Sequence, residues 1–161
     1  MPIKDIAVIG GGNGSLTMAG DMALAGFKVR MWTAFPEEFE KLYASRTLKL
    51  RGRGRTGDAA IDLVTRDLGE AVHGSQVICC PTPAFSQEEV ARQLGPDLED
   101  GQVLFLSPGS LGSYLCGTIF KANGWWRDIA IAEPGTLPYL TRKTKPDEVL
   151  VSGHAVRLPV G

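Results

Sequence analysis

The chain has 161 residues, a length that predicts one domain with a sizeable core. Its 43% hydrophobic and 22% charged residues are those of an ordinary globular protein, and its net charge of −1 gives no basic footprint for a nucleic-acid partner. Because no apolar run reaches the roughly 18 residues of a membrane span and no signal-peptide pattern opens the chain, we expect a cytoplasmic protein without a membrane partner.

Strands and helices are predicted to alternate along most of the chain. Short apolar or β-branched runs predict strands over 5–9, 28–32, 61–65, 76–80, 102–107 and 129–133. Helical patterns lie between them, over 13–25, 36–45, 67–74, 86–98 and, after a turn, within 108–124. The Gly/Arg-rich run 51–60 predicts a mobile surface loop between two short strands, and the tail 137–161 has only scattered β-prone pieces.

Five residues carry signals of helix ends. Gly26 stands where a C-cap is wanted, and Pro36 suits a first helical position. Asp67 is the expected N-cap of its helix. Ser86 and Glu89 have the spacing of a capping box.

This alternation predicts an α/β fold, a Rossmann-type doubly wound and mostly parallel sheet with helices on both faces. The runs 76–80 and 102–107 show little alternation, which is typical of strands covered on both faces. In such a sheet, ligands bind beyond the carboxyl ends of the strands where the strand order reverses. Residues 1–161 are therefore expected to form a single domain with its site at that edge.

A glycine-rich turn joins the first strand to the first helix. In Gly10-x-Gly12-x-x-Ser15, Gly10 would permit the tight turn and Gly12 would let a pyrophosphate approach the backbone, while Ser15 is small enough for helix–strand packing. Unpaired N–H groups at the helix start would face the phosphates. A turn kept only for packing explains one glycine but not the four that also include Gly11 and Gly14. This pattern predicts a dinucleotide site.

Thr33 bears on the choice of cofactor. An NAD site commonly has Asp or Glu at this point, about 20 residues past the glycines, bonded to the adenosine ribose. Threonine cannot repel a 2′-phosphate and its hydroxyl could donate to one, which allows NADP. Glu37 and Glu38 could reach back from the next helix, which keeps NAD open. The predicted cofactor is NADP or NAD, whereas FAD would want the missing acid.

Four segments together resemble the N-terminal NAD(P)-binding domain of the octopine/nopaline (opine) dehydrogenase family. They are IGGGNGSL (9–16), PTPAFSQEEVARQL (81–94), LFLSPGSLG (104–112) and AEPGTLPYLTRK (132–143). The last is the most specific, since a TLPY-x-x-R run after an acid is not general to Rossmann folds.

The resemblance implies a reaction: the NAD(P)H-dependent reductive condensation of an amino acid with a 2-oxo acid, in which hydride reduces an imine. It also implies a second, mostly helical domain that brings the substrate and a catalytic histidine. The chain stops before such a domain, so we expect it to be incomplete for catalysis alone. A homodimer remains open.

The resemblance also assigns cofactor-side positions. Those that would hold the pyrophosphate are Gly10, Gly12, Asn13, Gly14 and Ser15, and Thr33 would lie near the adenosine ribose. Those that would flank the nicotinamide ribose or form the next two loops are Pro81, Thr82, Pro83, Ala84, Ser107, Pro108, Gly109, Glu133 and Thr136.

No catalytic residue and no metal site are assigned from the sequence. His73 ends a short helix and His154 lies in the tail, so neither is at the end of a predicted sheet strand. Glu133 is at such an end and could touch the cofactor or bond its own loop. The cysteines lack Cys-x-x-Cys spacing and are expected to be buried thiols; they are Cys79, Cys80 and Cys116.

Other functions stay open. A free-standing nucleotide sensor would present a closed, polar surface, whereas exposed apolar side chains near 125–126 or 150–161 would favour a partner domain or dimer. A methyltransferase with an adenosyl cofactor shares the glycine turn but fits the TLPY segment poorly. The arginines of 51–55 would either hold a phosphate or lie in a solvated loop.

Overall fold

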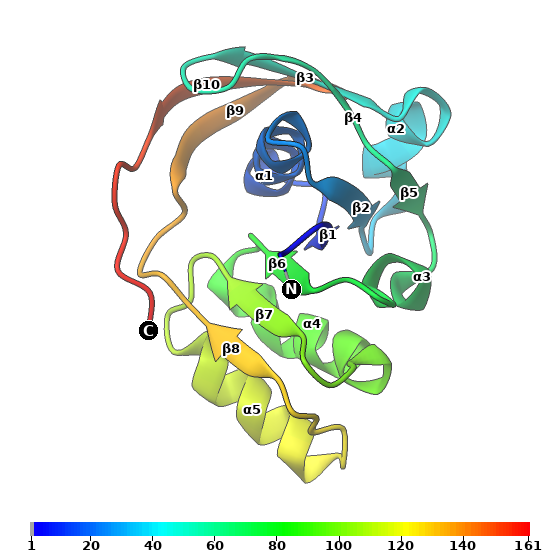
Figure 1. The fold of residues 1–161 in the computed structure, drawn as a ribbon, viewed down its shortest axis with the longest axis vertical. Helices are drawn as coiled ribbons and strands as arrows, with labels where there is room; N and C mark the ends of the chain where they lie inside the picture. The colour runs from blue at the N-terminus through cyan, green and yellow to red at the C-terminus, as the bar shows by residue number, and fades with distance from the viewer. Residues whose placement is uncertain (1) are drawn as a thin grey trace.

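A six-stranded parallel sheet forms the centre of the molecule (Figure 1). The structure, a computed structural model, describes residues 2–161. The sheet order is β5-β2-β1-β6-β7-β8, with bounds β1 Asp5–Ile9, β2 Lys28–Trp32, β5 Leu63–Thr65, β6 Val77–Cys80, β7 Val103–Leu106 and β8 Ala130–Ala132. All five neighbouring pairs are parallel. The order reverses between β1 and β6, so the predicted doubly wound fold is confirmed and its switch point lies beside the glycine loop.

Helices cover both faces of this sheet. They are α1 Asn13–Leu24, α2 Glu40–Ser45, α3 Leu68–Val72, α4 Gln87–Leu94 and α5 Gly112–Ala122, with short 3-10 turns η1 Pro36–Phe39, η2 Ala84–Ser86 and η3 Gly95–Asp97. Alternate residues of β1 enter two separate cores. Ile6 and Val8 pack with α1, whereas Ala7 and Ile9 pack with α4 and α5. The sheet is thus buried from both sides, as strands without alternation require.

A second, four-stranded sheet lies over the outer side of α1 (Figure 1). Its order is β4-β3-β10-β9, with bounds β3 Thr47–Gly52, β4 Gly57–Ala60, β9 Tyr139–Lys145 and β10 Glu148–His154. The sequence did not predict this sheet. The expected loop over 51–60 is wrong except for the turn 53–56, because the residues on either side of it belong to β3 and β4. Strand β10 pairs in parallel with β3, about a hundred residues earlier, and local periodicity carries no record of so distant a partner.

Helix α1 fits between the two sheets because one of its faces carries small residues. A Cβ atom on Gly20 would lie 2.0 Å from Leu50 Cδ1, so only glycine lets β3 approach this closely. Leu50 is 1% exposed, and Met18 and Ala19 of α1 are buried in the same core. The helix that begins at the glycine loop is therefore held by packing from both sides.

The helix ends follow the predictions with one exception. Gly26, at φ +95°, follows the C-cap of α1, and the Asp67 carboxylate accepts a hydrogen bond from Glu70 N at 3.1 Å. The Ser86–Glu89 capping box is wrong. Turn η2 precedes α4, so the Ser86 hydroxyl donates back to Pro83 O at 2.7 Å, while Glu89 accepts from Gln93. The predicted helix 36–45 begins as a 3-10 turn.

The three cysteines are free and buried, as predicted. Burial raises the pKa of the Cys79 thiol to about 12. Burial is also the main cause that raises the pKa of the Cys116 thiol to about 11. Burial also raises the pKa of Cys80, and the neighbouring thiols add to the effect. These side chains belong to the two cores and not to a reactive site. Among residues 2–161, no helix combines the length and hydropathy needed to cross a bilayer.

Candidate functional site

A cavity of about 360 Å³ opens at the carboxyl ends of β1, β2 and β6, where the strand order reverses. Three loops and one helix form its walls: the glycine loop, the segment after β2, the segment after β6 and the first turns of α4. The predicted site residues that line it are Gly10, Gly12, Ser15, Thr33, Pro81, Thr82 and Pro83. This is the position where a doubly wound sheet binds its ligand.

The glycine loop leaves bare backbone at the start of α1. Gly10, at φ +105°, turns the chain out of β1 while its N–H donates to Trp32 O at 2.7 Å. Gly12 is the N-cap residue, and no atom lies within 4 Å of the position that its Cβ would occupy. No side chain caps this end of the helix. Open space and uncapped N–H groups together suit an anionic group such as a diphosphate.

Ser15 ties the helix to the strand below it. Its hydroxyl donates to Ile9 O at 3.2 Å, and the residue is 1% exposed. A Cβ on Gly10 would lie 2.8 Å from Ser15 Oγ, so these two positions are matched in size. Ser15 is thus a packing residue at the floor of the cavity.

Asn13 and Gly14 face strand β9 and the segment that leads into it. The Asn13 side-chain oxygen accepts a hydrogen bond from Lys143 N at 2.7 Å, which fastens β9 to the start of α1. A Cβ on Gly14 would lie 3.0 Å from Leu137 Cδ1. Neither residue lines the cavity, so only their backbone can contribute to a phosphate site there.

The segment after β2 presents a carboxylate to the glycine loop. Thr33 is 2% exposed, and its hydroxyl donates to Glu38 Oε2 at 2.8 Å. The same hydroxyl accepts from Phe35 N at 3.2 Å. A Cβ on Gly11 would lie 2.2 Å from Glu38 Oε2, so the carboxylate rests against the Gly11 backbone. The expected donation from Thr33 to a 2′-phosphate is therefore not available, because Glu38 takes that hydrogen.

Thr82 supplies an unpaired polar group at the cavity. It follows β6, and its hydroxyl oxygen is buried without a hydrogen-bond partner among the described residues. A buried hydroxyl without a partner is unfavourable unless a ligand or water completes it. The residues present therefore fit a polar ligand that passes from the glycine loop toward β6.

The remaining predicted residues lie outside this cavity. Ala84 begins η2, while the others gather at the ends of β7 and β8. There Ser107 donates to Thr136 O at 3.4 Å, and Gly109, after Pro108, donates from its N–H to Pro134 O at 2.9 Å. Glu133 accepts a hydrogen bond from Ser113 N at 2.9 Å, so its carboxylate caps the start of α5. This is the loop-bonding alternative that the sequence left open.

Several cavity residues were missed by sequence reasoning. They are Ile9, Gly11, Trp32, Ala34, Phe35, Phe85, Ser86, Glu89, Val90 and Gln93. Most follow a predicted strand end or share one face of α4, which was the only signal that could have indicated them.

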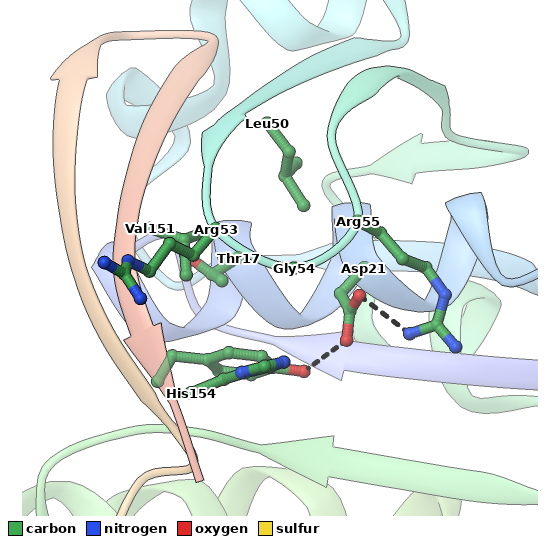
Figure 2. Close-up of a pocket in the computed structure, with 9 residues that line it drawn as sticks. Thr17, Asp21, Leu50, Arg53, Gly54, Arg55, Val151 and His154 are labelled. Atoms are coloured by element: carbon green, nitrogen blue, oxygen red, sulfur yellow. Dashed lines mark hydrogen bonds and ion pairs between the residues drawn. The ribbon is translucent and has the colours of Figure 1, made fainter. Parts of the chain in front are cut away.

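A second hollow of about 350 Å³ lies between α1 and the second sheet (Figure 2). Asp21 is at its centre, paired with Arg55 at 3.0 Å and accepting from the Tyr139 hydroxyl at 2.9 Å. Arg51 is paired with Asp58 at 2.8 Å. The side chain of Arg53 extends away from Asp21 (Figure 2). These arginines do not converge on a common point, and two of them are paired with carboxylates, so the hollow is not a phosphate site.

Tyr139 and Asp21 should contribute to stability. Burial, followed by the neighbouring Asp21 carboxylate, raises the pKa of Tyr139, so its hydroxyl stays protonated and donates. We expect Tyr139→Phe to lower the free energy of unfolding by about 1–2 kcal/mol, because a carboxylate loses a donor. Urea denaturation measures this value. Tyr114→Phe is the control: that ring is 79% exposed, and its loss of a hydroxyl should change stability by less than about 0.5 kcal/mol. Equal effects of the two changes would contradict the assignment.

The fold and the cavity together define a Rossmann-type dinucleotide-binding domain. A family model described as the NAD-dependent glycerol-3-phosphate dehydrogenase N-terminus matches residues 5–109, more than half of the chain, and the chain belongs to that family. The predicted resemblance to the N-terminal NAD-binding domain of opine dehydrogenases is also confirmed. The opine dehydrogenase of Arthrobacter sp. (strain 1C) is 30% identical over 150 residues, which are 92% of this chain and 42% of that enzyme.

Solved structures show the same fold. An octopine dehydrogenase in complex with NADH and agmatine superposes with a TM-score of 0.85 at 24% identity, over 98% of this chain and 41% of that one. A yersinopine dehydrogenase with NADP+ bound gives a TM-score of 0.78 at 19% identity, over 98% and 41%. The chain therefore spans less than half the length of the relatives that it matches.

Proposed function

We propose that this chain is the cofactor domain of an opine-dehydrogenase-like oxidoreductase, which condenses an amino acid with a 2-oxo acid using hydride from NAD(P)H. The observation that carries the proposal is the open space over Gly12 at the uncapped start of α1, located at the switch point of the sheet. There a diphosphate meets free N–H groups and the positive end of the helix. The named similarities to octopine and opine dehydrogenases indicate the substrate class.

The residues of this chain bind and orient the cofactor. The nicotinamide, when bound, supplies the hydride. The uncapped start of α1 at Gly12 holds the phosphates, and Gly10 turns the chain so that this end faces the cavity. The unpaired Thr82 hydroxyl bonds the part of the cofactor that lies near β6. Phe35 and Phe85, exposed at the cavity wall, offer apolar ring faces to the adenine. No residue of this chain is assigned a proton-transfer role.

The substrate is proposed to meet this domain through a second domain that docks on α5. Large apolar side chains are exposed there: Leu111 is 77% exposed, and Tyr114 and Trp126 line a shallow hollow of about 450 Å³ between α5 and β8. An exposed apolar surface of this kind marks an interaction site. It supports a partner domain over a free-standing sensor, and a second copy of the chain is the alternative occupant. The buried free thiols suit the reducing cytoplasm.

Calorimetric titration of the chain with NADH and, separately, NADPH tests cofactor binding. We expect saturable binding of at least one of them, because the glycine loop and cavity are formed within the described chain. Absence of binding to both would contradict the proposal.

In a steady-state assay with pyruvate, several amino acids and NAD(P)H, turnover should stay near background. Brisk turnover by this chain alone would contradict the need for a second domain.

A further inference from the structure

We propose that Glu38 selects NAD(H) over NADP(H), by occupying the place where the acid that bonds the adenosine ribose is usually found. The inference rests on the proposed function, because it requires that the cavity hold a dinucleotide. In Rossmann sites that acid directly follows the second strand. Here Thr33 stands at that position, and the carboxylate comes from five residues further along, in turn η1.

One hydrogen bond to the Glu38 carboxylate, the backbone of turn η1 and the absence of a side chain on Gly11 place this acid at the cavity. Thr33 donates to Oε2 at 2.8 Å, and the residue's own N–H donates to Phe35 O at 2.9 Å, which closes turn η1 back toward β2. Gly11 leaves the room, since a Cβ there would lie 2.2 Å from Oε2. Glu38 and both glycines, Gly11 and Gly12, line the same cavity. The acid therefore lies against Gly11, the residue next to the proposed diphosphate site at Gly12, where the adenosine ribose of a bound dinucleotide would begin.

The charge of the cavity favours an unphosphorylated ribose. Its lining contains two carboxylates, Glu38 and Glu89, and no Lys, Arg or His. A ribose diol offers two hydroxyl donors, which a carboxylate accepts. A 2′-phosphate brings about −1.5 to −2 charge and no strong donor, and would meet repulsion instead.

Two arginines in or beside the neighbouring strands are engaged elsewhere. The Arg30 guanidinium lies at the amino ends of the strands, away from the cavity, where it donates to His73 O and pairs with Asp5 at 3.4 Å. Arg66 borders a neighbouring hollow, and its guanidinium lies 4.4 Å from the centre of the Tyr43 ring. In this conformation neither side chain compensates a phosphate beside Glu38.

The experiment compares NADH and NADPH binding by calorimetry in the unaltered chain, Glu38→Gln and Glu37→Gln. We expect the unaltered chain to bind NADH at least tenfold more tightly, or about 1.4 kcal/mol. Glu38→Gln keeps an oxygen that can accept from Thr33 but removes the charge, so NADPH should bind more tightly and the preference should fall below threefold. Glu37→Gln removes the same charge from an exposed neighbour outside the cavity, and the tenfold preference should persist.

The outcomes separate the two proposals. If the unaltered chain binds neither nucleotide, the proposed function fails, and this inference fails with it. If both bind with equal affinity, or NADPH binds more tightly, the Glu38 inference alone is wrong. A preference for NADH that is unchanged in a folded Glu38→Gln variant, as checked by thermal unfolding, would likewise overturn the role of this residue.

Discussion

Gly12→Asp should abolish dinucleotide binding while leaving the domain folded. We expect NADH affinity to fall at least a hundredfold, or about 2.7 kcal/mol. The new carboxylate would project into the open space over residue 12, accept hydrogen bonds from the first N–H groups of α1 and repel the diphosphate. Calorimetric titration with NADH measures the loss.

The fold should tolerate this change because the backbone already suits it. Gly12 has φ −75° and ψ 178°, an extended conformation open to any residue, and Asp is a favoured N-cap. The midpoint of urea denaturation should therefore stay level or rise slightly. Gly12→Asn is the control, since it has the same shape without the charge. It should weaken binding by about tenfold, because its side chain competes for the same N–H groups. Retention of NADH affinity within threefold in folded Gly12→Asp would mean that the diphosphate lies elsewhere.

Gly52→Ala should be the most destabilising of the glycine substitutions proposed here, with a loss of about 2–5 kcal/mol in the free energy of unfolding. Gly52 has φ +98°, and its Cβ would lie 2.2 Å from Val151 O. The obstacle is the backbone of β10, which cannot move without breaking its pairing with β3. Denaturation by urea, followed by circular dichroism, measures the effect.

Gly26→Ala separates the two causes. Gly26 has a similar φ of +95°, but no atom lies within 4 Å of its Cβ position. Its substitution should reflect backbone strain alone, about 1–2 kcal/mol. If Gly52→Ala is no worse than Gly26→Ala, then β3 and β10 are not paired as closely as the structure has them.

The main sheet and its binding edge were predictable because their signals are local. Apolar runs separated by helical patterns indicate parallel β-α-β units, and the spacing of Gly10 and Gly12 after an apolar strand indicates a phosphate-binding turn. Helix ends were less reliable. Asp67 acts as a cap, as its type and position indicate. Ser86 precedes α4 as predicted, but turn η2 gives it a helical backbone and its hydroxyl donates back to Pro83 O, so its side chain does not cap the helix.

The second sheet and the carboxylate at the glycine loop were decided only by the tertiary structure. Strand β10 pairs with β3, which lies about a hundred residues earlier in the chain. Gly52, which was predicted to lie in a loop, pairs with Val151 of β10. Glu38 meets Gly11 because turn η1 folds back over the end of β2. Periodicity and residue spacing report what neighbours along the chain do. Contacts between distant segments depend on how the layers pack. The sequence therefore named Glu37 and Glu38 as candidate acids, and only the structure showed that Glu38 is the one that meets the glycine loop.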